Sequence, residues 1–421
     1  MDSSLDKNAT NSRGFSLSLG SLPKHILLLP GNLKYILETL IEISKTHQDI
    51  ETKRNACISI SSVFTKLDEQ EWKENFQFFA PIFDTLLLAC DNYHRDDRGD
   101  VGSWVREASI NSFLSVLTHL SFFIEKSIFW SQDLSLILSN CLLKQIGGKL
   151  DKLRVVAGNV FDCFVNKEEN FFFSSFLKNI SFLRELFPPS FTWNENDLVF
   201  QKLVNLISLD EYRENVLTRF LLCIHQNDKI ASILFDFLNV LQRKMVVNDE
   251  KNSILFLISE DLANIMSKYH KDSFNMESIL VSVDKIIKTS VFDCFVRPNF
   301  LFSANVNKWT YYCMKNDPTN VKILKPCISL FSSLLVFKEV TRPRSLQFIV
   351  DFLSHSYPVV RKHAAQVLLF SSYVFDDLVS PNFSVHFTQI LSSDTWDQKF
   401  SEETENNISL VKKYLDLPIN N

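Results

Sequence analysis

The sequence predicts an all-α fold of the HEAT/armadillo-like helical-repeat solenoid class. The chain has 421 residues, of which 46% are hydrophobic and only 8 are glycine and 12 proline. So few turn formers disfavour an all-β fold, which needs many tight turns. Amphipathic helical stripes recur along the chain, and an arginine motif returns at intervals of about 50 residues. We therefore expect stacked helices that share one continuous core.

The helices are predicted from apolar residues spaced three and four apart. The first clear stripe places Leu33, Ile36, Leu37, Leu40 and Ile41 on one face. Similar stripes occur at residues 58–67, 113–120, 134–143, 220–224, 233–241, 254–266 and 328–336. Polar or proline-containing breaks between helices fall at residues 30–31, 91–99, 187–189, 297–298, 317–318 and 342–343.

An arginine near the start of a helix, usually between an apolar and a small residue, marks the repeat. The arginines are Arg54, Arg106, Arg154, Arg213 and Arg361. Their spacings are about 52, 48, 59 and 148 residues, the last close to three units, slightly longer than typical HEAT or armadillo periods. We predict that each arginine reaches a carboxylate or carbonyl of the adjacent repeat. An irregular helical bundle is the alternative, but it would not repeat this pattern.

Three regions follow from composition. Residues 1–12 are predicted to be a flexible N-terminus, residues 13–399 the repeat domain, and residues 400–421 a polar tail with a short helix. We expect neither a membrane span nor a signal peptide, because charges interrupt the apolar runs and the first residues lack an apolar segment.

Charge and cysteine usage exclude several function classes. The net charge is -5 and no lysine/arginine block is present, so we expect no nucleic-acid partner. Eight cysteines lie at positions 57, 90, 141, 163, 223, 294, 313 and 327. None forms a C-x-x-C pair and most sit among apolar residues, which is typical of buried, reduced thiols in a cytosolic protein.

The stretch from Asp91 to Ser109 carries the strongest local signal. Two glycines, Gly99 and Gly102, lie three residues apart in a chain poor in glycine, which indicates a positive φ angle or a close backbone approach. Ser103 is predicted to cap the helix that follows, with Glu107 in its first turn. The candidate partner-binding or repeat-junction residues are Arg95, Asp97, Arg98, Gly99, Asp100, Gly102, Trp104 and Arg106.

We weighed catalytic and ligand-binding interpretations of this stretch against a structural one. Its carboxylates lack the spacing of an EF-hand loop, so we expect no metal. No phosphate-binding loop, nucleophile elbow or paired histidines occur, so we expect no cofactor and no catalysis. Arg95 or Arg98 as an arginine finger for a GTPase is one hypothesis, and a salt-linked junction between repeats is the one we favour. Trp104 is a hot-spot candidate, although packing between repeats is commoner.

Two segments resemble a known family. Residues 13–23, Arg-Gly-Phe-Ser-Leu-Ser-Leu-Gly-Ser-Leu-Pro, are similar to a segment of tubulin-specific chaperone D, also called tubulin-folding cofactor D. Residues 98–106, Arg-Gly-Asp-Val-Gly-Ser-Trp-Val-Arg, are similar to a second segment of that family. Weaker similarities follow in order at residues 149–154, 212–217 and 357–362. The similarity corresponds to the C-terminal portion of the longer family members, and a glycine pair of the family is replaced by residues 225–227.

The resemblance implies a non-catalytic chaperone that binds β-tubulin and acts after the chaperonin. It implies work with cofactors C and E and an Arf-like small GTPase to assemble or dissociate the αβ-tubulin dimer. It also implies stimulation of GTP hydrolysis within that complex, a cytoplasmic location and, for some members, association with microtubules. The alternative is a generic HEAT-repeat scaffold for another protein cargo.

Overall fold

The computed structural model describes residues 2–168, 171–189, 191–244, 253–293, 301–338 and 341–418, and it omits the side chains of residues 2–9 and 171. Within these ranges the regular structure is helical, apart from an isolated bridge between Asp96 and Gly99. The chain divides into two compact units, Met1–Leu203 (unit 1) and Val204–Asn421 (unit 2). The predicted break at residues 297–298 and Cys294 lie outside the described residues.

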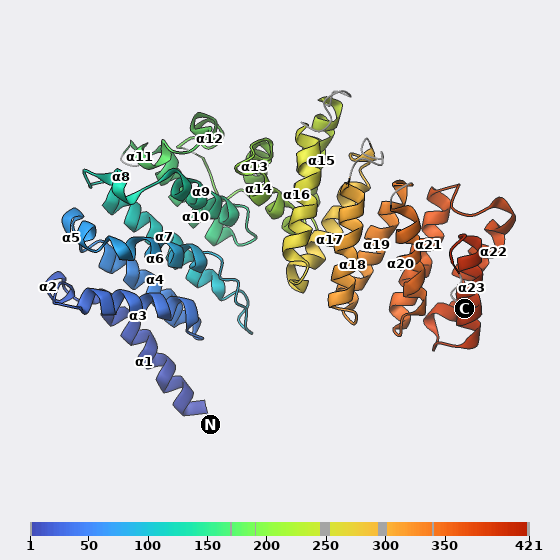
Figure 1. Cartoon of the computed structure of the whole chain (residues 1–421), viewed down its shortest axis with the longest axis horizontal. Helices are drawn as coiled ribbons and strands as arrows, with labels where there is room; N and C mark the ends of the chain where they lie inside the picture. Colours follow the sequence, from blue (N-terminus) through green and yellow to red (C-terminus); the bar gives the residue numbers. More distant parts are fainter. Residues whose placement is uncertain are drawn as a thin grey trace. The chain divides into compact units, whose positions relative to one another are not determined.

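Unit 1 is a stack of helical hairpins (Figure 1). In the inner layer α1, α4, α7 and α10 pack in succession, while α3 pairs with α4, α6 with α7 and α9 with α10. The bounds of these helices are α1 Asp2–Ser21, α3 Asn32–Thr46, α4 Ile50–Phe64, α6 Phe79–Ala89, α7 Gly102–Leu120, α9 Gln132–Ile146 and α10 Asp151–Asn166. No hairpin buries its apolar face alone, so each depends on its neighbours for a core.

Short helices lie in the segments that return from one hairpin to the next. They are α2 Lys24–Leu27, α5 Glu69–Glu74, η1 Phe76–Phe78, α8 Lys126–Phe129, α11 Phe171–Ser174, α12 Ile180–Leu186 and α13 Asn196–Leu203. Ion pairs fix some of them, since the Lys24 ammonium of α2 lies 2.7 Å from the Glu71 carboxylate of α5. One edge of unit 1 is therefore built from these one- and two-turn helices.

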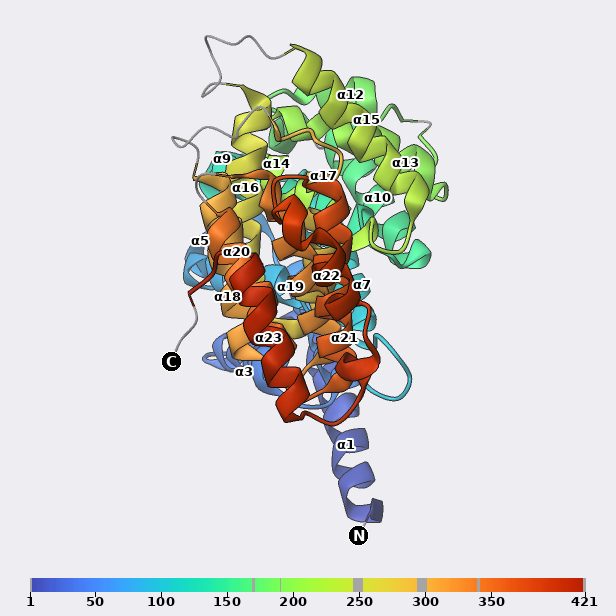
Figure 2. The same cartoon turned by 90° about the vertical axis from the view of Figure 1, so that its right-hand side faces the viewer.

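Unit 2 repeats the same arrangement. Its inner layer is α14, α17, α19 and α21. The helices α16, α18 and α20 form a second layer that packs against this inner layer (Figure 2). The bounds are η3 Val204–Ser208, α14 Arg213–Cys223, α15 Asp228–Lys244, α16 Ile254–Tyr269, α17 Ser273–Ile287, α18 Phe302–Asn316, α19 Val321–Ser333, η6 Leu334–Val336, α20 Arg342–Asp351, η7 Phe352–Ser354, α21 Pro358–Val374, α22 Pro381–Leu391, η8 Asp394–Asp397 and α23 Glu402–Tyr414. Paired helices stacked in two layers are the HEAT-like architecture, so the predicted fold class is confirmed.

Helices lie at both ends of the described chain. Residues 2–12 lie in the first turns of α1. The second half of α1 is fixed on α4, where Ser59 donates to the Ser16 carbonyl at 2.7 Å, and a helix extends at little cost once nucleated. At the other end, α23 begins at Glu402, earlier than the predicted helix at residues 408–415, and it packs against α22.

Close packing of α1 on α4 explains Gly20. A Cβ atom at Gly20 would lie 2.4 Å from the Ser59 hydroxyl oxygen, so only glycine permits this approach. Arg13 completes the contact through two hydrogen bonds to the Asp49 carboxylate, at 2.9 and 2.6 Å, and Asp49 caps α4 through the Thr52 amide. Gly20 and Arg13 therefore serve the packing of α1 on α4.

Asp49→Asn is expected to destabilise unit 1 by about 1–2 kcal/mol at pH 7, because the charged cap and its arginine partner are lost. The Arg13 guanidinium holds the pKa of the Asp49 carboxyl well below its usual range. A lowered folded-state pKa contributes stability above the unfolded pKa, near 4, and that contribution is lost as the pH falls. Urea unfolding of both proteins should therefore show a difference that shrinks towards pH 2. An equal difference at pH 7 and pH 3 would contradict this linkage.

None of the helices in the described part of the chain combines the length and the apolar character needed to cross a membrane.

Candidate functional site

The loop between α6 and α7 contains a tight turn. The Asp96 amide donates to the Gly99 carbonyl at 3.1 Å and the Gly99 amide donates to the Asp96 carbonyl at 2.9 Å. Gly99 has a φ of 102°, in the region that side chains disfavour. The Arg98 guanidinium returns to the Asp96 carboxylate at 2.6 Å. The turn is exposed, but its backbone is fixed by its own hydrogen bonds.

Gly102 begins α7 where two backbone segments meet. Its amide donates to the His94 carbonyl at 2.9 Å. A Cβ atom here would lie 2.4 Å from the Asn92 carbonyl oxygen and 2.6 Å from the His94 nitrogen. Both expected reasons for glycine are present: Gly99 has a positive φ angle, and Gly102 lies close to a second backbone segment.

The predicted capping role of Ser103 is wrong. The N-cap residue is Val101, and the Ser103 hydroxyl donates to the Asp100 carbonyl at 2.6 Å. Loop carbonyls already accept the first amides of α7, which leaves no need for a side-chain cap. Glu107 lies one turn further along than predicted and pairs with Lys152 of α10 at 2.8 Å.

Arg106 is buried beneath the loop, with an exposed fraction of 2%. Its guanidinium donates to the Asn92 carbonyl at 2.6 Å and to the Asp100 carboxylate at 2.8 and 3.2 Å. The Tyr93 ring lies 4.4 Å from the guanidinium carbon, close enough for a cation–π contact. Arg106 therefore joins both ends of the loop to the first turns of α7.

The loop also contacts the hairpins on both sides of its own. Asp91 pairs with Lys144 of α9, and the Gln145 side-chain amide donates to the Cys90 carbonyl at 2.9 Å. In the other direction, the Arg98 guanidinium lies 3.8 Å from the Glu51 carboxylate of α4. These contacts are what a junction between repeats requires.

The structure brings some predicted residues together and leaves others apart. Arg98 lies over the Trp104 ring at 5.0 Å, and Asp100 pairs with Arg106. Arg95 and Asp97 are exposed on the turn.

The repeat arginines occupy the first or second turn of inner-layer helices, but they make different bonds. Arg154 and Arg361 are buried and, like Arg106, donate to carbonyls of the loop before their own helix, at Gly148 and His355. Contact with the next repeat occurs for Arg213, which pairs with Asp261 of α16, and for Arg361, which also donates to the Gln398 carbonyl.

The predicted bonding to the adjacent repeat is therefore wrong for Arg106 and Arg154. Their guanidinium groups instead satisfy carbonyls of the loops that precede their own helices. Arg54 differs again, since its guanidinium bonds the neighbouring Asn55 side chain at 3.0 Å and faces a groove.

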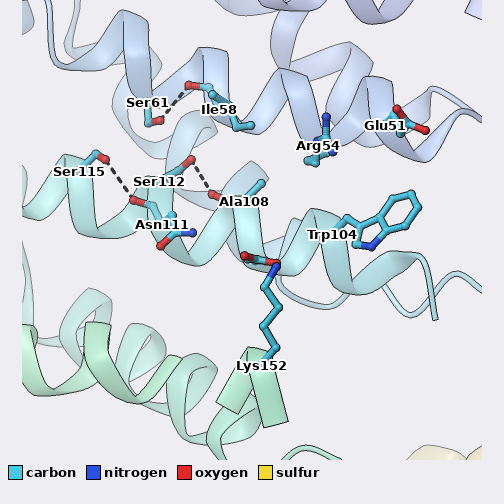
Figure 3. Close-up of a pocket in the computed structure, with 11 residues that line it drawn as sticks. Glu51, Arg54, Ile58, Ser61, Trp104, Ala108, Asn111, Ser112, Ser115 and Lys152 are labelled. Atoms are coloured by element: carbon cyan, nitrogen blue, oxygen red, sulfur yellow. Dashed lines mark hydrogen bonds and ion pairs between the residues drawn. The ribbon is translucent and has the colours of Figure 1, made fainter. Parts of the chain in front are cut away.

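This groove runs across the exposed faces of α4, α7 and α10 and encloses about 690 Å³ (Figure 3). Figure 3 shows side chains entering it from all three helices, with Trp104 at one end and Ser115 at the other. The lining residues are Glu51, Arg54, Ile58, Ser61, Trp104, Glu107, Ala108, Asn111, Ser112, Ser115 and Lys152. Half-buried Trp104 is the largest side chain among them. We name this surface the unit 1 groove.

Sequence reasoning missed most of the unit 1 groove. On α4 its residues are spaced at 54, 58 and 61, and on α7 at 104, 108, 111 and 115. These are ordinary helical intervals, and they include the buried residues Ser61, Ala108 and Ser112 where α4 and α7 pack together. What the pattern lacked was the order in which the helices stack, which decides whose outer faces adjoin.

Burial and spacing limit the thiol and metal-binding chemistry of the described residues. The Cys57 thiol is buried in the α4 core, and burial raises its pKa to about 12. Such a thiol is a poor nucleophile at neutral pH. Among the residues that the structure describes, no group of three or more histidine, cysteine or acidic side chains is placed to hold a metal ion.

The middle of the chain is similar to a known protein family. Residues 137–311 match the sequence model described as tubulin folding cofactor D C terminal. This part of the chain is therefore similar to the C-terminal region of tubulin folding cofactor D. The match begins in α9 and ends within α18. It therefore includes α10, which contributes Lys152 to the unit 1 groove.

A curated relative extends the similarity beyond this cofactor D region. The chain is 25% identical to tubulin-specific chaperone D of Dictyostelium discoideum over 476 aligned positions, which cover 97% of this chain. The chain spans 31% of the length of that relative.

Solved structures with stacked helices are also similar at low identity. A chain of the Pds5–Scc1 complex is 12% identical with a TM-score of 0.30, covering 97% of this chain and 68% of that one. Kap121p is 12% identical with a TM-score of 0.26, covering 97% of this chain and 49% of that one. The fold assignment above depends on the helix packing in this structure and not on these matches.

Proposed function

We propose that this chain is a non-catalytic tubulin-folding cofactor that binds β-tubulin and helps to assemble or dissociate the αβ-tubulin heterodimer. The observation that carries the proposal is the cofactor D match over residues 137–311, supported by the relative aligned along 97% of the chain. A helical-repeat surface suits this task, because stacked hairpins present an extended face to a folded protein.

The proposal extends to the partners that the family resemblance implies. In the cytoplasm the chain would act with cofactors C and E and an Arf-like GTPase, and it would join complexes that associate with microtubules. Its contribution to GTP hydrolysis would be to position the GTPase. Arg98 is a poor arginine finger in this state, since it is held by Asp96 and lies over Trp104.

The unit 1 groove and the adjoining loop are our proposed β-tubulin contact. Trp104 lies at the groove end nearest the loop and offers a large, half-buried ring held by Arg98. Aromatic side chains of this kind dominate binding energy at protein interfaces. Arg95 and Asp97 on the exposed turn would lie at the rim of the same contact.

Trp104→Ala is expected to weaken β-tubulin binding about tenfold, which corresponds to about 1.4 kcal/mol. Binding of the purified chain to β-tubulin is measured by interferometry, and retention of cofactors C and E and the GTPase by pull-down. Tyr35→Ala is the matched control, because Tyr35 is an exposed aromatic residue on α3, outside the groove.

The outcomes separate two parts of the proposal. Unchanged binding by Trp104→Ala would reject the groove as the contact and leave the cofactor function standing. If the unaltered chain retained none of these partners, the cofactor proposal would fail for this chain, and the scaffold alternative would replace it.

A further inference from the structure

A second groove lies in unit 2, on the inner-layer helices α17, α19 and α21, and encloses about 560 Å³. Its C-terminal half is apolar and open. Phe370 and Val374 of α21 are 68% and 55% exposed, and Val336 faces them from η6. These apolar side chains have no described partner segment over them. We name this surface the unit 2 groove.

The other half of the unit 2 groove is polar, with Ser329 and His363 on its wall. Lys288, which directly follows α17, lies on the wall of the half where the helices end, and the Asp284 carboxylate neutralises it at 2.6 Å. Lys325 forms no ion pair with any carboxylate among the described residues, and it lies one helical turn before the groove-lining Ser329 on the same face of α19. His363 in turn contacts the Ser329 hydroxyl at 3.3 Å. Lys325 is therefore a cation without a counter-charge beside the groove.

The two ends of the groove differ in charge. Lys325 is near the start of α19, whereas Asp293 follows the end of α17 and lines the opposite half. The three helices also end at that half, so their dipoles place partial negative charge there. An acidic side chain is thus favoured near Lys325 and disfavoured near Asp293.

We propose that the unit 2 groove binds an amphipathic helix of a partner protein, with apolar side chains against Phe370 and Val374 and a carboxylate facing Lys325. From Lys325 to Val336 is 11 residues of helix, about 16 Å, so the bound segment spans about three turns. Apolar anchors at helical spacing and one charge pair are the usual elements of helix-in-groove recognition. This site is separate from the β-tubulin contact proposed above and does not depend on it.

The test uses two fluorescein-labelled synthetic helical peptides and the full chain. Both peptides carry leucines at helical spacing at one end, and the other end carries glutamates in one peptide and lysines in the second. Anisotropy titrations should show the glutamate peptide binding at least tenfold more tightly. Phe370→Ser should weaken binding of the glutamate peptide about tenfold.

Charge reversal supplies the sharper test. Lys325→Glu should weaken the glutamate peptide and strengthen the lysine peptide, which loss of folding would not do. Lys413→Glu, an exposed reversal on α23, and Phe122→Ser, an exposed apolar loss in unit 1, should change neither titration. Failure of both peptides to bind, equal binding of both, or an unchanged preference in Lys325→Glu would overturn the proposal.

Discussion

Gly102→Ala is expected to lower the free energy of unfolding by about 3 kcal/mol, one of the largest effects of a single added carbon in this chain. The new Cβ atom would lie 2.4 Å from the Asn92 carbonyl oxygen and 2.6 Å from the His94 nitrogen. Both are backbone atoms of a loop fixed by Arg106, so neither can turn aside as a flexible side chain would. Urea unfolding followed by circular dichroism measures the loss.

Two further glycines calibrate this result. Gly99→Ala meets open space but a φ of 102°, so a smaller loss of about 1–2 kcal/mol is expected from backbone strain. Gly14→Ala, in an exposed turn of α1 with nothing within 4 Å, should stabilise by about 0.5–1 kcal/mol. If all three substitutions had equal effects, the close approach at Gly102 would not be the cause.

The same series separates the two roles of the α6–α7 loop. A loss of β-tubulin binding in Gly102→Ala that follows the loss of folding supports the junction role alone. Lost binding in a fully folded Gly99→Ala protein supports a contact role for the exposed turn.

The repeat architecture could be predicted because it depends on local patterns. Apolar stripes and arginines at helix starts are visible in the sequence, and the arginines lie on the inner-layer helices α4, α7, α10, α14 and α21. The importance of Gly99 and Gly102 was also predictable. Other residues rarely replace glycine where φ is positive or where a second backbone lies close.

Bonds that depend on distance could not be predicted in the same way. Arg106 and Arg154 donate to their own loops, whereas Arg213 bonds across to α16, although all three share one sequence motif. Likewise the residues of the unit 1 groove have ordinary helical spacing, and only the stacking of α4 on α7 makes them a surface.

Arg106→Met is expected to cost about 3 kcal/mol of stability, because it leaves the Asp100 carboxylate and the Asn92 carbonyl without their shared donor. Methionine keeps most of the buried volume, so the loss reports the polar contacts more than a cavity. Arg106→Lys should recover only part of the stability, since one ammonium cannot reproduce the fork that reaches both acceptors. Chemical unfolding of the three proteins gives the comparison.

Arg98→Met is the matched control. Arg98 also bonds an aspartate of the same loop, but its side chain is 53% exposed whereas that of Arg106 is 3% exposed. Exposed pairs contribute about 0–1 kcal/mol, so this variant should unfold almost as the unaltered chain does. A loss at Arg98 as large as that at Arg106 would show that the turn, and not the buried guanidinium, holds the junction together. Asp100→Asn combined with Arg106→Met should cost less than the sum of the single changes, because both remove the same buried pair.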